Sequence, residues 1–385
     1  MLKSTDLTYK KPLRRNKTMK KRILAILLSA IMVLSMVACA SEDTASDDTN
    51  ADASSDAAYH FEIIVKSFQS TYWQAAVKGV ENAKAELGVT ANCNGPATES
   101  DIADQVQMLD SAIESAPDGI GLAACDTNSV LDSLQKALDA GIPVVCFDTG
   151  VADAPEGSVV ATVATDNAAA GACAATNMYP VLKDKIAAAT TAAQVRIGEV
   201  NQDATALNIQ QRGLGFIDEM IKLCNADGKK VAVVGNEFYV GAATGAVAEA
   251  EAEVIIEVGV PSQTVVAEAA AVAQAIMAKE DTIAIFGSNQ TTAEGVITAN
   301  ETLNVLGADG IIAAGFDAGA PQKAAINAGQ LIGSVTQSPL MMGYHCVYTL
   351  FDACEGKTVA DMPMDGYWYN TENMEADDIA PNLYD

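Results

Sequence analysis

Two similar ten-residue segments constrain the fold more than any other part of the chain. Residues 141–150 have the sequence GIPVVCFDTG, and residues 310–319 have the sequence GIIAAGFDAG. Each contains a short apolar run that ends in an aspartate, Asp148 in the first and Asp317 in the second. An apolar run without alternation predicts a strand buried on both faces, as in a parallel sheet. Because ligands of open α/β sheets bind beyond the carboxyl ends of the strands, the two aspartates are candidate ligand-binding groups in two similar units that face each other.

The remainder of the chain from residue 59 alternates between strand-like and helix-like segments. Strands are predicted over residues 60–66, 89–93, 118–124, 143–147, 158–164, 194–200, 229–234, 253–258, 282–286, 311–316 and 331–336. Helices are predicted over residues 72–87, 100–114, 128–140, 168–182, 206–223, 263–278, 291–300, 320–328 and 340–354. Residues 183–193 and 235–245 are expected to be connections, and the tail after residue 354 has no predicted element. This order predicts an α/β fold with two Rossmann-like lobes, each built on a parallel sheet. Continuous strands are expected to pass between the lobes near residues 162–166 and 333–337.

The N-terminal segment has the composition of a secretion signal. Lys20, Lys21 and Arg22 precede an apolar run over residues 23–38, which is short for a membrane span and ends at Cys39. Residues 34–39, LSMVAC, resemble a bacterial lipobox, in which the cysteine is acylated; a plain signal peptide with an incidental cysteine is the alternative. We therefore predict a signal region over residues 1–38. A lipidated Cys39 and a flexible acidic tether over residues 39–58 are expected to anchor the protein to the outer face of the cell membrane.

The charge of the chain limits its partners. The sequence holds 50 acidic residues against 23 Lys and Arg, for a net charge of −27. Removal of the basic signal region makes the remainder still more acidic. Such a surface repels nucleic acid and anionic lipid head groups and argues against an anionic ligand.

The residue inventory argues against catalysis and against a metal site. The sequence has two histidines, His60 and His345, and neither has a Ser or Cys nearby in a recognisable catalytic arrangement. No GxSxG, GxxxxGK[ST], HExxH or glycine-rich dinucleotide motif is present. The cysteines lack CxxC spacing, so no zinc site is predicted, and a Cys346–Cys354 disulfide stays open. We expect no enzyme activity and no cofactor; glycosidic cleavage by the two aspartates is the catalytic alternative, but acids on different lobes suit clamping better.

Polar and aromatic side chains follow several of the other predicted strands. Carboxylates, amides and ammonium groups hydrogen-bond sugar hydroxyls, while aromatic faces pack on the C–H faces of a sugar ring. This combination favours sugar binding. Asp126 has a second explanation as the cap of the helix that follows it. The candidates outside the two repeated segments are Lys66, Ser70, Tyr72, Trp73, Asp126, Asn289 and Gln337.

From residue 59 to residue 354 the chain resembles the periplasmic-type (type I) substrate-binding proteins of ABC importers, in the ribose/galactose/xylose class. The segments that carry the resemblance are TYWQAAVKGVENAKAELG, GPATESDIADQVQ, GIPVVCFDTG, VATDN, QRGLGF, FGSNQ, GFDAG and GSVTQS. It implies two lobes joined by three hinge crossovers, with a sugar in the cleft. The N-terminal lobe is then expected over residues 59–165 plus 338–365, and the C-terminal lobe over residues 166–337 plus 366–385.

The resemblance also assigns roles to individual residues. The family's aromatic pair falls on Tyr72 and Trp73, its two acids on Asp148 and Asp317, its amides on Asn289 and Gln337, and its crossover hydroxyl on Thr165. Two positions that are usually Arg in the ribose and galactose binders hold Thr149 and Gln210, and Lys66 stands where a small polar residue is common. Loss of both Arg forks changes the hydrogen bonds offered to a ligand, so ribose itself is not expected.

The resemblance implies a monomeric, extracytoplasmic solute-binding lipoprotein that delivers a small sugar to an ABC permease and its ATPase. The alternatives are a receptor for autoinducer-2 or another polyol or nucleoside, since autoinducer-2 receptors also place a lysine and two acids at the cleft, and a ligand sensor that works with a chemoreceptor or sensor kinase. A transcriptional regulator of the same fold would need an N-terminal DNA-binding domain, where this sequence has a signal.

Overall fold

The protein is described here by a computed structural model that covers residues 59–384. The predicted signal region, the lipidation site Cys39 and the acidic tether lie outside these residues. Within residues 59–384, no helix combines the length and apolarity needed to cross a membrane.

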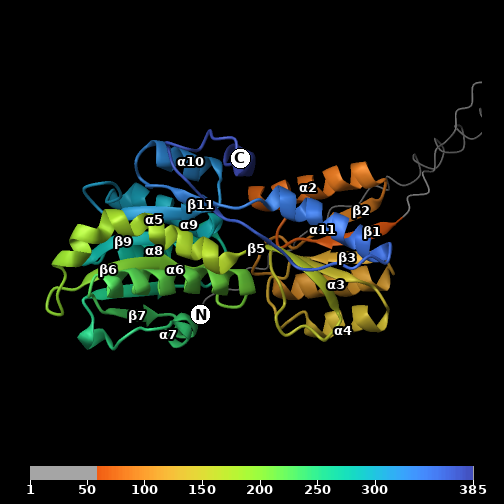
Figure 1. Cartoon of the computed structure of the whole chain (residues 1–385), viewed down its shortest axis with the longest axis horizontal. Coiled ribbons are helices and arrows are strands. Elements are labelled where there is room, and N and C mark those ends of the chain that lie inside the picture. Colours follow the sequence, from red (N-terminus) through yellow and green to blue (C-terminus); the bar gives the residue numbers. More distant parts are fainter. Residues whose placement is uncertain (1–58, 385) are drawn as a thin grey trace, which may run out of the picture. The chain divides into compact units, whose positions relative to one another are not determined.

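The first lobe is built on a six-stranded, fully parallel sheet (Figure 1). In spatial order its strands are β12 (Met362–Met364), β5 (Val159–Thr165), β4 (Val144–Phe147), β3 (Gly119–Leu122), β1 (His60–Ile64) and β2 (Thr90–Asn94). Helices α2 (Thr71–Leu87) and α11 (Pro339–Cys354) pack on one face, and α3 (Ile102–Glu114) and α4 (Leu131–Asp139) pack on the other. Both faces are therefore buried, which explains the apolar runs without alternation.

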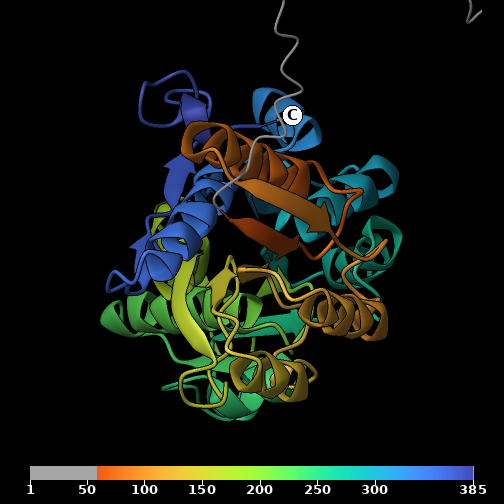
Figure 2. The same ribbon diagram turned by 90° about the vertical axis from the view of Figure 1, so that its right-hand side faces the viewer.

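The second lobe is built on a seven-stranded sheet in which β13 alone is antiparallel. In spatial order its strands are β13 (Tyr367–Tyr369), β11 (Ser334–Thr336), β10 (Ile312–Phe316), β9 (Thr282–Gly287), β6 (Val195–Val200), β8 (Val254–Gly259) and β7 (Val231–Gly235). Helices α5 (Asn167–Ala188) and α6 (Leu207–Ala226) cover one face, and α8 (Val266–Met277), α9 (Gln290–Leu303) and α10 (Ala320–Asn327) cover the other. Figure 2 shows the same arrangement from the side of the first lobe.

The chain passes between the two sheets three times within the described residues. It leaves the first sheet after Thr165, returns after Thr336, and crosses again between Met364 and Tyr367. The predicted continuous strands are wrong, because each strand ends within its own sheet and a helix begins at once. The Asp166 carboxylate accepts the amide N–H of Ala169 at the start of α5.

Five short elements of the described residues were not predicted from the sequence. The segment 235–245, expected to be a connection, contains α7 (Glu237–Ala242), whose first turn is capped by the Asn236 side chain. The tail supplies β12, which pairs with β5, and β13, which pairs with β11. Both strands are three residues long, too short for an alternation pattern to mark them. Single-turn 3₁₀ helices occupy Glu249–Glu251 and Ala380–Asn382.

The disulfide that the sequence left open is not formed. Cys346 is buried in the core of the first lobe, and Cys354 is half-buried with a free thiol. Cys346 packs as a small apolar residue among the side chains of α2 and α11.

Candidate functional site

The two predicted aspartates occupy equivalent backbone positions. Asp148 follows β4 and Asp317 follows β10, and both lie in the left-handed region, with φ of 62° and 71°. Their exposed fractions are 4% and 3%. Asp tolerates this backbone better than most residues, and such conformations gather at ligand sites because the surrounding structure holds them in place. The repeated segment therefore places one buried carboxylate at the edge of each sheet.

The Asp148 carboxylate is surrounded by four donors. The Tyr72 hydroxyl from the first turn of α2 donates to one oxygen. The Thr149 hydroxyl at 2.8 Å and the Asn208 amide at 3.0 Å donate to the other. The ammonium group of Lys66 lies 3.6 Å from the same oxygen and donates to the Asn208 carbonyl at 3.2 Å. Because Asn208 belongs to α6, this network joins the two lobes.

The Asp317 carboxylate has fewer partners. The backbone N–H of Gln290, at the start of α9, donates to one oxygen at 3.0 Å. The Gln337 amide donates to the other at 2.7 Å. The Thr165 hydroxyl donates to the Gln337 carbonyl at 2.6 Å and so fixes the orientation of that amide from the first lobe.

Burial raises the pKa of Asp317 to about 6. The positive charge of Arg212 and the hydrogen bonds from Gln337 and Gln290 oppose this rise, while the negative charge of Asp148 adds to it. Asp317 is therefore a titratable group near neutral pH.

Arg212 is a buried cation placed by a close helix crossing. Helices α5 and α6 approach so closely that a Cβ on Gly171 would lie 2.0 Å from the Arg212 carbonyl oxygen. The guanidinium donates to the Asn167 carbonyl at 2.7 Å and to the Ser288 backbone carbonyl at 2.9 Å. It also lies 3.6 Å from the centroid of the Phe316 ring, so hydrogen bonds and a cation–π contact fix it beside Asp317.

A third carboxylate, Glu99, completes the arrangement. Its oxygens accept the Trp73 indole N–H at 2.8 Å and the Gln202 amide at 2.7 Å. The Asn289 amide donates to the Gln202 carbonyl, so this chain of bonds also crosses between the lobes. Burial raises the pKa of Glu99, and the charge of Lys66 opposes that rise.

These side chains enclose one cavity between the lobes, which we call the inner cavity. Its volume is about 20 Å³, because the lining side chains bind one another across it. The sequence-predicted residues that line it are Lys66, Ser70, Tyr72, Trp73, Asp148, Asn289, Asp317 and Gln337.

Four predicted residues do not line the inner cavity. Thr149 and Thr165 donate to Asp148 and to Gln337, so they orient side chains that do. The Asp126 carboxylate accepts two backbone N–H groups and the Ser129 hydroxyl in the next turn, as a local cap would. Gln210 donates to the backbone carbonyl of Ala204 at 2.7 Å.

Sequence analysis missed several lining residues. Arg212 and Gln290 stand inside motifs that carry the resemblance, QRGLGF and FGSNQ, so those motifs contained the signal. Glu99 also stands inside such a motif, GPATESDIADQVQ, whereas Asn208 lies in the first turn of α6, where no strand-end pattern marks it. The missed residues are Glu99, Gln202, Asn208, Ile209, Arg212, Gln290 and Thr291.

Solved structures that are similar to this chain include proteins named as parts of ABC transporters. A solved structure of an ABC transporter, LacI family transcriptional regulator, from Brachyspira murdochii is 30% identical, with a TM-score of 0.70 over 85% of this chain and 99% of its own. An ABC transporter solute-binding protein from Agrobacterium vitis, with bound D-fucose, is 27% identical, with a TM-score of 0.69 over 84% of this chain and 100% of its own.

A curated relative matches over a shorter stretch. The D-allose-binding periplasmic protein of Escherichia coli (strain K12) is 27% identical over 120 residues, which cover 30% of this chain and 39% of the relative. The model of the periplasmic binding protein domain family matches residues 61–358, which include most of both lobes and the residues that line the inner cavity. The chain therefore belongs to the periplasmic binding protein domain family.

Proposed function

We propose that this protein captures a small sugar between its lobes, outside the cytoplasm, and delivers it to an ABC importer. The observation that carries the proposal is the inner cavity, where carboxylates, amides and two buried cations from both lobes meet beside Tyr72 and Trp73. The solute-binding protein that is 27% identical holds D-fucose, and the curated relative binds D-allose.

In the proposed mechanism, sugar hydroxyls replace bonds that the site makes with itself. Hydroxyl groups donate to Asp148 and Asp317 and accept from Lys66 and from the amides, while an aromatic ring packs on the sugar. Bonds such as that from Lys66 to Asn208 already link the lobes at the cavity. A ligand that contacts both lobes favours the closed arrangement only through these added contacts.

The finer parts of the proposal concern location and organisation. Residues 1–38 are proposed to be a secretion signal, and Cys39 is proposed to carry the lipid. The protein is proposed to be a monomer that passes the sugar to a permease and its ATPase. It is proposed to perform no catalysis and to hold no cofactor. The proposed lobe boundaries, near residues 165, 337 and 365, agree with the three passages between the sheets. Changing Cys39→Ala is expected to release the protein from the membrane fraction; an unchanged distribution would contradict lipidation.

Isothermal titration calorimetry tests sugar capture. The unchanged protein and its Asp148→Asn and Asp317→Asn variants, each without the N-terminal segment 1–58, are titrated with sugars. The sugars are D-allose, D-fucose, D-galactose, D-glucose and D-arabinose. We expect binding of at least one sugar, weakened about tenfold or more in each variant because a hydroxyl loses a charged acceptor. Asp139→Asn, on the outer turn of α4, is the matched control and should bind as the unchanged protein does. Equal affinities in all variants would reject the two aspartates as ligand groups, and continuous product formation from any sugar would reject a purely binding role.

A polyol signal such as autoinducer-2 is the second candidate. Lys66 favours it, because this lysine is 1% exposed and lies beside Asp148 inside the cavity. Adding autoinducer-2 to the same titrations separates the two candidates.

A further inference from the structure

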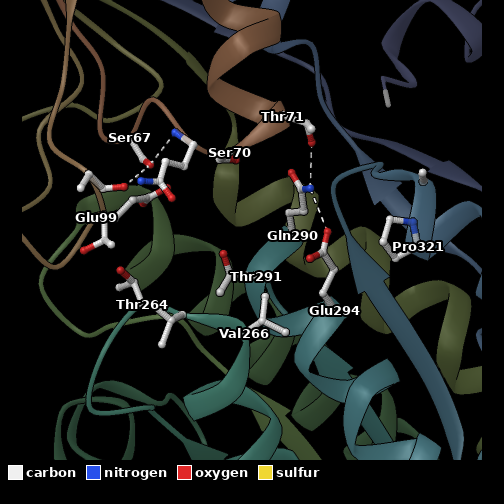
Figure 3. A pocket seen from close by; sticks show the side chains of 15 residues that line it. Ser67, Ser70, Thr71, Glu99, Thr264, Val266, Gln290, Thr291, Glu294 and Pro321 are labelled. Atoms are coloured by element: carbon white, nitrogen blue, oxygen red, sulfur yellow. Dashed lines mark hydrogen bonds between the residues drawn. The ribbon is translucent and has the colours of Figure 1, made fainter.

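A second, much larger cavity lies next to the inner one. This outer cavity has a volume of about 430 Å³ and lies at the mouth of the cleft, between the first turns of α2, α8 and α9 (Figure 3). It shares Ser70, Glu99, Gln290 and Thr291 with the inner cavity. The two cavities are therefore neighbours, with these four residues between them.

The outer cavity persists although the lobes touch at its sides. On one side, the Ser100 and Thr264 hydroxyls are 2.9 Å apart, and the Thr264 backbone N–H donates to Ser100 at 2.7 Å. Elsewhere on its rim, the Gln290 amide donates to the Thr71 hydroxyl at 3.0 Å, as Figure 3 shows. Contact between the lobes thus leaves this space open.

The two cavities are neighbours but differ greatly in volume. At about 20 Å³ the inner cavity has room for roughly one water molecule, which needs about 10–15 Å³. The outer cavity falls within the range of small-molecule pockets, about 300–1,000 Å³. A ligand that reaches the inner side chains must therefore displace their mutual bonds, whereas the outer cavity accepts a group of ring size without rearrangement.

The lining of the outer cavity defines the chemistry of such a group. Glu99 and Glu294 supply carboxylate acceptors, and Thr291 supplies a hydroxyl. Val266 and Pro321 form an apolar wall. None of its lining residues in the described part of the chain is a lysine or arginine, so an anionic group has no charged partner there.

We propose that the ligand is longer than one sugar ring: one ring contacts the inner side chains, and a second, uncharged hydroxylated ring occupies the outer cavity. The substrate class is then a neutral disaccharide or glycoside rather than a free monosaccharide. This inference rests on the proposed function and specifies its substrate.

Calorimetry with matched pairs of sugars tests the inference. D-galactose is compared with melibiose and lactose, D-glucose with maltose and cellobiose, and cellobiose with cellobiouronic acid, which adds one carboxylate. We expect at least one disaccharide to bind tenfold or more tightly than its monosaccharide, and the acid to bind at least tenfold more weakly than cellobiose if cellobiose is the ligand.

Variants locate the second ring. Val266→Trp fills the outer cavity and is expected to weaken disaccharide binding tenfold or more, with less than a twofold effect on the monosaccharide. Ala267→Trp, the next residue of α8 and an exposed one, is the control for the bulky side chain. Glu294→Gln is expected to weaken the disaccharide severalfold, whereas Glu301→Gln, exposed at the far end of the same helix, should not.

The outcomes separate the two proposals. A monosaccharide that binds as tightly as every disaccharide, or a Val266→Trp variant that weakens both equally, overturns the second ring and leaves sugar capture intact. If no sugar of either size binds, sugar capture and the second ring are both wrong.

Discussion

Asp148 and Asp317 end the same sequence motif with nearly the same backbone, yet their surroundings differ. Asp148 has a lysine 3.6 Å away and accepts hydrogen bonds from three side chains. Asp317 accepts one backbone N–H and one amide, and Arg212, whose charge acts on it, makes its hydrogen bonds to other groups. The pKa of Asp317 is raised to about 6 by burial, despite the charge of Arg212.

The shared motif therefore determines where each carboxylate lies but not how its charge is compensated. Position follows from the strand and its left-handed exit, which the two segments share. The charge of Asp148 is compensated by Lys66, which follows another strand of the first lobe. The charge of Asp317 is compensated by Arg212, which a close helix crossing places in the second lobe. Replacing each aspartate by asparagine is therefore expected to change the stability of the protein in opposite directions.

The largest expected effect is the loss of stability in Asp148→Asn. The change leaves the Lys66 ammonium buried without its anion, and breaking a buried pair costs about 3–5 kcal/mol. Urea unfolding at pH 7 is expected to show a free energy of unfolding lower by about that amount. The double variant Lys66→Met with Asp148→Asn should recover most of the loss, because both charges of the pair are then removed together. If Asp148→Asn unfolds like the unchanged protein, Lys66 is not compensated by Asp148.

Asp317→Asn is expected to act in the opposite direction, and only at higher pH. The folded-state pKa of about 6 lies above the ordinary value near 3.8, so the folded state binds the proton more tightly. The stability contributed by that proton is complete below about pH 4 and is lost as the pH rises through about 6. The loss amounts to about 3 kcal/mol, since each pKa unit is worth about 1.4 kcal/mol.

Unfolding of both proteins from pH 4 to pH 7.5 measures this effect. Asp317→Asn should match the unchanged protein near pH 4 and exceed it near pH 7, since the amide carries no charge to bury. If the free energies of unfolding of the two proteins differ by the same amount at every pH from 4 to 6, Asp317 does not titrate in this range.

The repeated motif and the alternation of strand-like and helix-like segments made the fold and much of the site predictable from the sequence. Parallel strands buried on both faces leave apolar runs, and their carboxyl ends converge at one edge, so Asp148, Asp317, Asn289 and Gln337 could be placed together. The strands at the lobe crossings were not predicted to stop within their own sheets, because helix caps such as Asp166 decide where a strand stops.

The remaining site residues take their roles from tertiary contacts. Arg212 lies beside Asp317 because helices α5 and α6 cross closely at Gly171, and Glu99 is held by Trp73 and Gln202 from different lobes. Asp126 is the opposite case: it follows a strand, but its carboxylate accepts N–H groups of the next turn and does not line the cavity. Such roles depend on tertiary neighbours, which a single sequence does not display.

The C-terminal tail supports the segment that follows the second aspartate. The Ala318 backbone N–H, next to Asp317, donates to the Tyr384 hydroxyl at 3.3 Å. The Tyr384 ring packs edge-on against Tyr72 of the first lobe, with centroids 5.9 Å apart. Tyr384→Phe should lower the free energy of unfolding by about 1 kcal/mol, since a buried N–H loses its acceptor.

Thermal unfolding checks this effect against Tyr344→Phe, a tyrosine whose hydroxyl donates to the Glu86 carboxylate at the surface. The surface change should cost less, because water replaces the lost bond. Equal losses in the two variants would mean that the tail does not support the second motif.

The smallest expected effect comes from making the two motifs alike. Thr149→Ala converts FDTG into FDAG and removes the hydroxyl that donates to Asp148 at 2.8 Å, while Thr149→Ser keeps it. Asp148 retains Tyr72, Asn208 and Lys66, so the loss should stay near 1 kcal/mol or below and sugar affinity should fall less than fivefold. Urea unfolding and calorimetry of both variants measure this. A loss in Thr149→Ala as large as that of Asp148→Asn would show that the hydroxyl, rather than the lysine, secures the first aspartate, because removing it would then be equivalent to removing the charge itself.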